Sequence, residues 1–227
     1  MRKLDGIRRQ DALTRERIVE ASIAILDEDG EKALTFQALA RRLRTGAGAI
    51  YWHVENKRDL IIAACDAIMV DVIGASTASQ RPPAEEIRAL SLALFDAMDA
   101  RPWVGSALAQ APGAVPTLRV LDHFGRQIQA LGTSDEEEWT VVAALLSYVL
   151  GVGAQNAANA KTAHMRQLER SAFLAEMAKQ WAALDPAAFP FVQSVAAKMP
   201  VHDDRADFLT GIDLFLDGIA ARKTMHV

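Results

Sequence analysis

The sequence contains a single cysteine, Cys65, so no disulfide can form within the chain. A lone cysteine is typical of proteins in a reducing compartment, so we expect a cytoplasmic location and a packing role for Cys65. No apolar run reaches the length of a membrane span. The charged N-terminal stretch MRKLDGIRRQD is not followed by the apolar core of an export signal, so we expect no membrane partner.

Alternating runs of β-branched residues, which predict strands, are also nearly absent. Hydrophobic residues make up 51% of the 227 residues and charged residues 24%, which is sufficient for a packed, soluble globular fold. Ala and Leu at helical spacing predict an all-α protein. The predicted helices cover about 14–29, 35–43, 47–53, 56–74, 84–100, 103–110, 114–131, 135–159, 166–184 and 204–222, with a further helix start at Asp185-Pro186.

The net charge of −4 argues at first against a nucleic-acid partner. The charge is unevenly distributed, however. Residues 1–60 hold 12 Lys and Arg against 10 Asp and Glu, whereas residues 61–227 hold 13 against 19. The modest positive excess in the N-terminal segment permits DNA binding without demonstrating it.

The segment Thr35–Leu60 is the most informative part of the chain, because it reads as two short helices joined by a tight turn. In a helix-turn-helix, the second helix enters the major groove of DNA while the first crosses the phosphate backbone. Apolar residues are expected to fix the angle between the two helices: Leu39, Leu43, Ile50 and Val54. The segment therefore predicts a DNA-binding unit.

Small residues open the second helix, which would let its backbone approach DNA closely. Neighbouring hydroxyl, amide and aromatic side chains can contact phosphates or base edges, and a lysine can hold a phosphate at the start of the next helix. The predicted DNA contacts are Thr35, Gln37, Thr45, Ala47, Gly48, Tyr51, Trp52, His53 and Lys57. Additional positive charge comes from Arg41, Arg42 and Arg44, and from a candidate N-terminal arm of Arg2, Lys3, Arg8 and Arg9.

These residues also have plainer interpretations. Short helix pairs with a glycine turn are common in helical proteins, and Tyr51 is alternatively a core residue. The N-terminal arginines are alternatively a solvated tail.

Three stretches carry a family resemblance. LTFQALARRLRTGAGAIYWHVENKRDL (Leu34–Leu60) resembles the N-terminal domain of the tetracycline-repressor (TetR) family of bacterial transcription regulators, with YWHVENK as its most specific part. LTRERIVEASIAILDEDG (Leu13–Gly30) is similar to the first helix of that family, and FLTGIDLFLDGIAAR (Phe208–Arg222) to the last helix of its tetracycline-repressor branch. The resemblance implies a homodimer, with a DNA-binding domain of about three helices in residues 1–60 and a larger ligand-binding and dimerisation domain in 61–227.

The sequence departs from the family pattern in two places. Arg44 stands at the usual turn glycine and Gly46 at the frequent serine cap, which predicts an operator of its own. The tetracycline-binding branch holds its drug through magnesium on a histidine. The corresponding stretch Val104–Pro112 lacks a histidine and places Ala107 there, which argues against tetracycline-magnesium. We expect no metal site and no cofactor.

A pocket between helices is the effector site that the family implies, and apolar, aromatic and amide residues of the middle helices are candidates to line it. They are Trp103, Gln110, Phe124, Trp139, Val142, Leu146, Gln155 and Asn156. Core packing is the alternative for each of them. Two glycines within a predicted helix, Gly151 and Gly153, indicate close helix packing or ligand approach. The remaining histidines are expected to be surface or hydrogen-bonded residues: His123, His164, His202 and His226.

Dimerisation is expected through the helices at 135–159 and 204–222. The second carries an apolar stripe of Phe208, Ile212, Phe215, Leu216 and Ile219, for which packing within one chain is the alternative.

The sequence thus predicts a ligand-responsive transcriptional regulator rather than an enzyme. In the favoured form it is a repressor that a small, largely apolar effector releases from a palindromic operator. The helix that begins near Lys57 would connect the DNA to the ligand domain. A transcriptional activator of the same fold remains open, as does a helical enzyme or carrier with an incidental helix-turn-helix.

Overall fold

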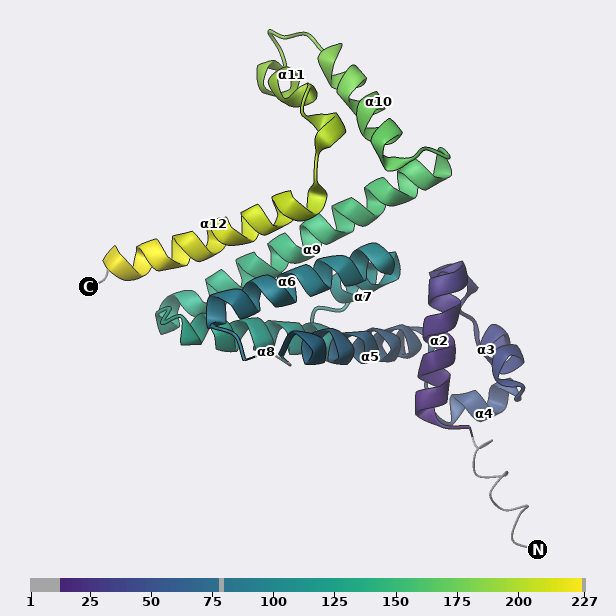
Figure 1. The fold of residues 1–227 in the computed structure, drawn as a ribbon. Coiled ribbons are helices and arrows are strands. Elements are labelled where there is room, and N and C mark those ends of the chain that lie inside the picture. Colours follow the sequence, from purple (N-terminus) through teal and green to yellow (C-terminus); the bar gives the residue numbers. More distant parts are fainter. Residues whose placement is uncertain (1–12, 78–79, 226–227) are drawn as a thin grey trace, which may run out of the picture.

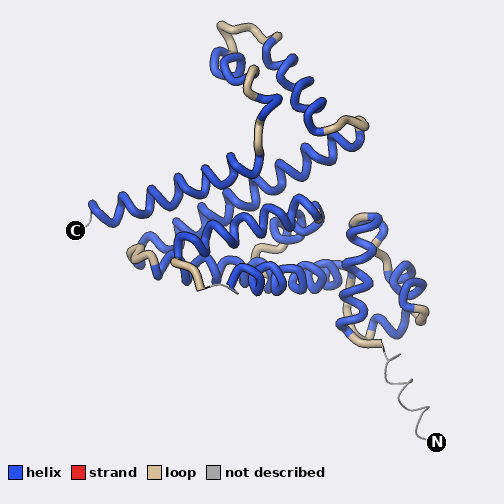
Figure 2. The backbone as a smooth tube through the Cα atoms, viewed as in Figure 1, coloured by secondary structure: helices blue, strands red, loops and turns tan. Residues whose placement is uncertain are grey.

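The computed structural model describes residues 13–77 and 80–225, and every regular element in these ranges is helical, which confirms the predicted all-α fold (Figure 1, Figure 2). In chain order the elements are α2 (Arg15–Asp29), η1 (Glu31–Ala33), α3 (Phe36–Leu43), α4 (Ala47–Tyr51), α5 (Lys57–Thr77), α6 (Pro83–Ala100), α7 (Pro102–Gln110), α8 (Val115–Ala130), α9 (Asp135–Met165), α10 (Arg170–Ala182), α11 (Pro190–Ala196), η2 (Met199–Val201) and α12 (Asp204–Met225).

The elements form three regions in Figure 1. The head consists of α2, η1, α3 and α4. The body consists of α5 to α9 and α12. The arm, made of α10, α11 and η2, projects from the body where α9 ends and α12 begins.

The head is a small helical unit with a dry interior. Completely buried side chains meet at its centre: Ile18, Leu34, Leu39, Ile50 and Leu60. Val54 is 5% exposed and Leu43 packs against the core while remaining partly exposed, so the predicted packing residues lie where expected. Burial of these apolar surfaces fixes α3 and α4 relative to α2.

The helix α5 joins the head to the body, because it packs against α2 as well as α6 and α8. The predicted domain boundary at residue 60 falls within α5, which continues through it. Cys65 of α5 is completely buried, as expected for a packing residue. Its burial, and to a smaller extent the charge of Asp66, raises the pKa of the Cys65 thiol to about 12.

The longest helix, α9, has 31 residues and packs against α6, α7, α8 and α12. A Cβ atom placed on Gly153 would lie 2.1 Å from Cε of Met98 in α6, so this glycine permits close helix packing, one of the two predicted roles. Gly151 instead faces open space. Ala107, which the resemblance places near the metal-binding histidine of the tetracycline-binding branch, is buried in α7.

The structure corrects several helix ends. The helix α4 stops at Tyr51, so Trp52 and His53 follow it in a turn. The helix α9 extends six residues beyond the predicted end at residue 159, to Met165. Asp185-Pro186 opens a turn, in which Asp185 Oδ1 accepts from the backbone N–H of Ala187 at 2.9 Å, and the next helix begins only at Pro190. An Asp-Pro pair has the same local chemistry in a turn as at a helix start.

The apolar stripe of α12 was expected at a dimer interface, but much of it packs inside the protomer. Phe208, Ile212 and Leu216 are at most 7% exposed, and the Phe208 ring stacks on Phe95 and Tyr148 with centroid distances of 4.8 and 5.6 Å. The periodicity of the stripe identified a buried helix face, and periodicity alone does not tell which chain covers it.

Two helices, α5 and residues 135–160 of α9, are long and apolar enough to cross a membrane by length and composition alone. Both also pack against neighbouring helices of the body. Within the α9 stretch, only 28% of the most apolar window is buried in the protomer.

Candidate nucleic-acid interface and ligand cavity

The two short helices of the head begin and end with well-defined local structures. Thr35 precedes α3, and its Oγ1 accepts from the backbone N–H of Ala38 at 3.0 Å, which satisfies one of the free donors of the helix start. Arg44 ends α3 in the left-handed conformation, with φ 53° and ψ 45°. The backbone N–H of Thr45 then donates to the carbonyl of Ala40 at 2.9 Å. The turn therefore keeps the geometry that glycine usually provides, although a non-glycine residue forms it.

Large aromatic side chains lie exposed around the C-terminus of α4. Trp52 is 90% exposed and Tyr51 55% exposed, which excludes the core alternative for Tyr51. The Tyr51 ring stacks on Phe36 of α3 at a centroid distance of 4.2 Å and an interplanar angle of 11°. This stack holds the Tyr51 ring in one orientation while leaving its surface available. His53 is also exposed.

Gly46 and Gly48, at the front of α4, are not required by the fold. Neither has a positive φ, and a Cβ atom added to either would meet no other atom within 4 Å. Glycine within a helix is destabilising, so its presence at Gly48 calls for another reason. A partner that closely approaches this backbone from outside supplies one.

The start of α5 lies next to this surface. Asn56 Oδ1 accepts from the backbone N–H of Asp59 at 3.0 Å and so caps the helix. Lys57 is partly buried, and its Nζ donates to the carbonyl of Glu31 at 2.6 Å. A phosphate at Lys57 would therefore share this ammonium group with η1 or displace the carbonyl.

The three arginines of α3 and its turn are not equivalent. Arg42 forms two hydrogen bonds of 2.6 Å to Glu28 of α2, and these bonds hold the pKa of the Glu28 carboxyl below its usual value. Arg41 and Arg44 are exposed and have no ion pair among the described contacts. All three were expected to add positive charge near the DNA, but the Arg42 guanidinium is paired with Glu28 within the head. The candidate N-terminal arm lies outside the described residues.

Asp27, next to Glu28 in α2, connects the head to the body. Arg101 Nε donates to Asp27 Oδ2 at 3.0 Å, and Trp103 Nε1 donates to Asp27 Oδ1 at 2.8 Å. Arg101 and Trp103 lie at the junction of α6 and α7. The sequence had assigned Trp103 to a ligand pocket, and no sequence signal indicated its partner, because 76 residues separate Trp103 from Asp27.

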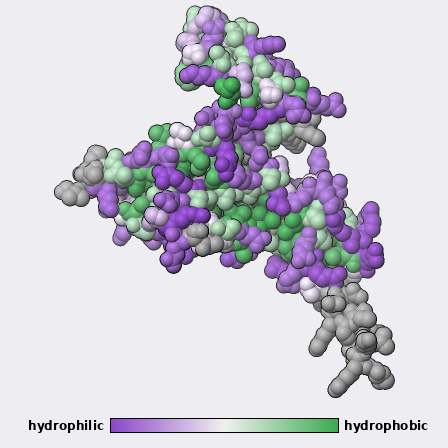
Figure 3. Space-filling view, viewed as in Figure 1, coloured by the Kyte–Doolittle hydropathy of each residue, from purple (hydrophilic) through white to green (hydrophobic). Residues whose placement is uncertain are grey.

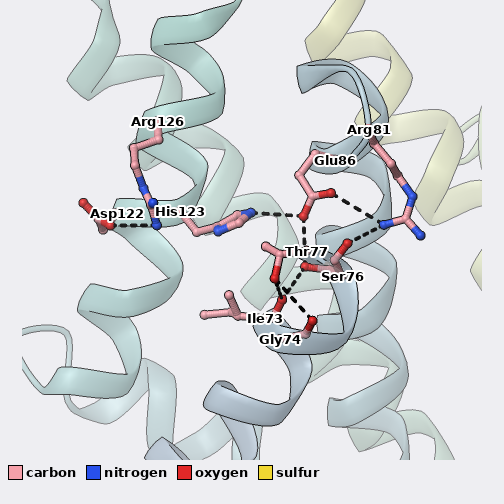
Figure 4. Close-up of polar contacts among 9 residues, drawn as sticks. All are labelled: Ile73, Gly74, Ser76, Thr77, Arg81, Glu86, Asp122, His123 and Arg126. Carbon is pink, nitrogen blue, oxygen red and sulfur yellow. Dashed lines mark hydrogen bonds and ion pairs between the residues drawn. The ribbon is translucent and has the colours of Figure 1, made fainter. Parts of the chain in front are cut away.

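A buried polar cluster holds the opposite end of α5 (Figure 4). Glu86 of α6 accepts from Ser76 Oγ at 3.0 Å, and its Oε1 lies 3.2 Å from His123 Nε2 of α8. Arg81 lies 3.5 Å from the other carboxylate oxygen. His123 is 3% exposed, so it is buried and hydrogen-bonded, one of the two expected settings, although its Nδ1 has no hydrogen-bond partner. Three helices are thus joined at this point.

A cavity of about 800 Å³ lies between the arm and the body. Its apolar lining includes Phe95 of α6 and Phe173 of α10, and its polar lining includes Asp99, Asn156 and Glu169. The volume is within the range typical of small-molecule sites.

The predicted ligand residues do not come together in this cavity. Trp103, Phe124, Val142 and Leu146 are buried in the body, Gln110, Trp139 and Gln155 are exposed, and Asn156 lines the cavity. The first four face neighbouring helices, so their apolar character reflects core packing in this structure. Within the described residues, no group of three His, Cys, Asp or Glu side chains is placed to hold a metal ion.

Residues 18–64 match the family described as "Bacterial regulatory proteins, tetR family", and residues 80–223 match "Tetracyclin repressor-like, C-terminal domain". A helix-turn-helix-type transcriptional regulator of Saccharopolyspora erythraea is 30% identical over 152 residues, which cover 63% of this chain and 61% of that protein. The match thus spans about three fifths of this curated relative.

Two solved structures extend the likeness to most of the chain. SCO7222, a TetR regulator from Streptomyces coelicolor, has a TM-score of 0.82 and 43% identity, covering 92% of this chain and 99% of that chain. BioQ with its natural double-stranded DNA operator has a TM-score of 0.58 and 25% identity, covering 92% and 99%. Since family matches cover both the head and more than half of the chain, the protein belongs to the TetR family of bacterial transcriptional regulators.

Proposed function

We propose that this protein is a cytoplasmic, dimeric repressor that binds a palindromic DNA operator through α3, α4 and the start of α5. The observation that carries the proposal is the open surface at Gly46 and Gly48, beside the exposed rings of Tyr51 and Trp52. The fold leaves room there for a backbone that approaches from outside. The DNA-bound BioQ structure supports DNA as that partner.

A dimer is supported by the uncovered face of α9. Small exposed residues follow one another along this face: Ala144, Ser147, Gly151, Ala154 and Ala158. Trp139 of α9 and Leu214 of α12 are 67% and 69% exposed. Small residues allow helices to approach closely, and an isologous contact on this face would give a two-fold dimer. In such a dimer the two recognition helices would lie about one DNA turn, roughly 34 Å, apart.

Two ion pairs and the chain segments between them connect the cavity to the DNA-binding unit. Asp99 lines the cavity near the end of α6, two residues before Arg101. Arg101 binds Asp27 of α2, and the adjacent Glu28 binds Arg42 of α3. A ligand that binds better when α6 is displaced would shift the population toward a head position that no longer matches the operator.

A gel shift with the DNA upstream of the protein's own gene tests the DNA-binding assignment. We expect Tyr51→Ala combined with Lys57→Ala to weaken binding by about 100-fold or more, and we expect wild-type binding to fall steeply with salt. Lys179→Ala, on the arm, is the matched control for the lost positive charge. If the double variant folds and binds like the wild type, the interface has been assigned wrongly.

A reporter gene behind the same upstream DNA distinguishes repression from activation. Deletion of the regulator should raise expression if it is a repressor. A fall in expression would favour the activator of the same fold.

A further inference from the structure

We propose that the cavity between the arm and the body binds an amphipathic organic cation, and that this ligand is the effector. The inference rests on the proposed function, because it names the class of molecule to which the regulator responds. It replaces the largely apolar effector that the sequence had led us to expect.

The polar lining of the cavity is rich in negative charge. Five carboxylates line it: Asp96, Asp99, Glu169, Asp203 and Asp204. They face two guanidinium groups, those of Arg170 and Arg205, and the imidazole of His202.

Both guanidinium groups are already paired within the protomer. Arg170 forms an ion pair with Asp204 and also donates to the carbonyl of His202 at 3.0 Å. Arg205 Nε lies 3.1 Å from Asp96 Oδ1. An anionic ligand would compete with these carboxylates for the guanidinium groups, whereas a cationic ligand would not.

The other three carboxylates, those of Asp99, Glu169 and Asp203, have no ion pair among the described contacts. Asp203 accepts hydrogen bonds from the backbone N–H groups of Ala206 and Arg205, and these bonds lower its pKa. Asp99 Oδ1 accepts from Asn156 Nδ2 at 2.6 Å, which orients the carboxylate while its Oδ2 keeps no described partner. Arg170 and Arg205 also act electrostatically on Asp203, but five carboxylates outnumber the two guanidinium groups, so the lining presents an excess of negative charge.

Aromatic and aliphatic side chains supply the other half of the recognition. Phe95 and Phe173 line the cavity and are 4% and 8% exposed, and Leu174 lies beside them. Aromatic surfaces bind flat apolar groups and also attract organic cations. The volume of about 800 Å³ suits a molecule of drug size rather than a bare ion.

Fluorescence anisotropy of two dyes with the same xanthene body tests the charge preference. Rhodamine 6G is cationic and fluorescein is anionic at neutral pH. We expect the full-length protein to bind rhodamine 6G at least about tenfold more tightly than fluorescein. Equal binding of the two dyes, or displacement of rhodamine 6G by millimolar Mg²⁺, would overturn the proposal.

Variants locate the bound dye. Asp99→Asn with Glu169→Gln should weaken rhodamine 6G binding by about tenfold, whereas Asp71→Asn, an exposed carboxylate of α5 outside the cavity, should not. Asn159→Asp adds a carboxylate to the lining and should tighten binding. Misfolding would lower the affinity for the dye, so an increase in affinity cannot be mistaken for an effect of misfolding. Unchanged affinity in both cavity variants would place the dye elsewhere and refute the site.

The effector role is tested separately, by adding rhodamine 6G to the protein–DNA complex and measuring release of the DNA. Release of DNA supports the role, and binding of the dye without release refutes it. If the dye-free protein does not bind DNA at all, the proposed function fails while the dye titration still decides the cavity.

Discussion

The head and the arm present two different kinds of surface. The head has an open outer surface, on which Trp52 is 90% exposed and a Cβ atom added to Gly46 or Gly48 would meet no other atom within 4 Å. On the visible face of Figure 3, the outer edge of the head is mainly hydrophilic, whereas apolar residues gather over the body. The arm is instead tied to the body by Arg170–Asp204, and Arg205–Asp96 joins α12 to α6 beside it. Residues at the head surface can therefore change function without loss of the fold, whereas residues at the cavity rim also hold the arm in place.

The largest effect is expected from breaking the head alone. Leu39→Ala removes a completely buried side chain, which should lower the free energy of unfolding of the head by about 3 kcal/mol. Urea unfolding should show an earlier transition for the head, and operator binding should be lost. Rhodamine 6G binding should persist, since the cavity lies between arm and body. Simultaneous loss of dye binding would contradict the independence of the two regions.

The next effect separates function from stability within the head. Gly48→Ala adds a methyl group where no atom lies within 4 Å, so the fold should gain up to about 1 kcal/mol from the better helix former. Operator affinity should nevertheless fall by about tenfold, because the methyl group occupies the space kept for DNA. Gly74→Ala, also in open space but on α5, is the matched control and should leave affinity unchanged. Wild-type affinity in Gly48→Ala would contradict close approach at this position.

A smaller effect is expected from breaking the contacts between the head and the body at Asp27. Asp27→Ala removes the acceptor of both Arg101 and Trp103, so about fivefold more rhodamine 6G should be needed to release DNA. Operator affinity without dye should change by less than about threefold. Asp29→Ala, an exposed carboxylate of the same helix, serves as control. A normal release curve for Asp27→Ala would show that the signal travels by another route.

The smallest effect concerns the turn of the head. Arg44 has φ 53°, and a left-handed non-glycine residue costs about 1–2 kcal/mol. Arg44→Gly should therefore raise the melting temperature by about 2–4 °C. Arg41→Gly, inside α3, should lower it, because glycine is a poor helix former. A lower melting temperature for Arg44→Gly would show that the arginine side chain stabilises the turn more than its backbone conformation costs.

The head could be predicted in detail because its residues lie close together in the chain. Thr35 as a helix cap and Leu39 and Ile50 as packing residues follow from local spacing, and the structure confirms them. The assignment of individual DNA contacts stays a prediction. The proposed effector site could not be predicted in the same way, because the cavity lining comes from α6, α9, α10, η2 and α12. Trp103 illustrates the difficulty: its sequence context resembles a pocket wall, but its indole N–H binds Asp27 in the head.

Helical periodicity, caps and a short motif are local properties, so the all-α class, the helix-turn-helix and the family follow from the amino-acid order alone. The folded structure was needed to identify the core face of α12, since Phe208 and Ile212 pack inside the protomer. It also decided that Arg42 is paired with Glu28 and that five carboxylates meet at one cavity. The physical reason is that charge pairing and burial depend on distances between segments far apart in the chain, and side-chain periodicity does not encode those distances.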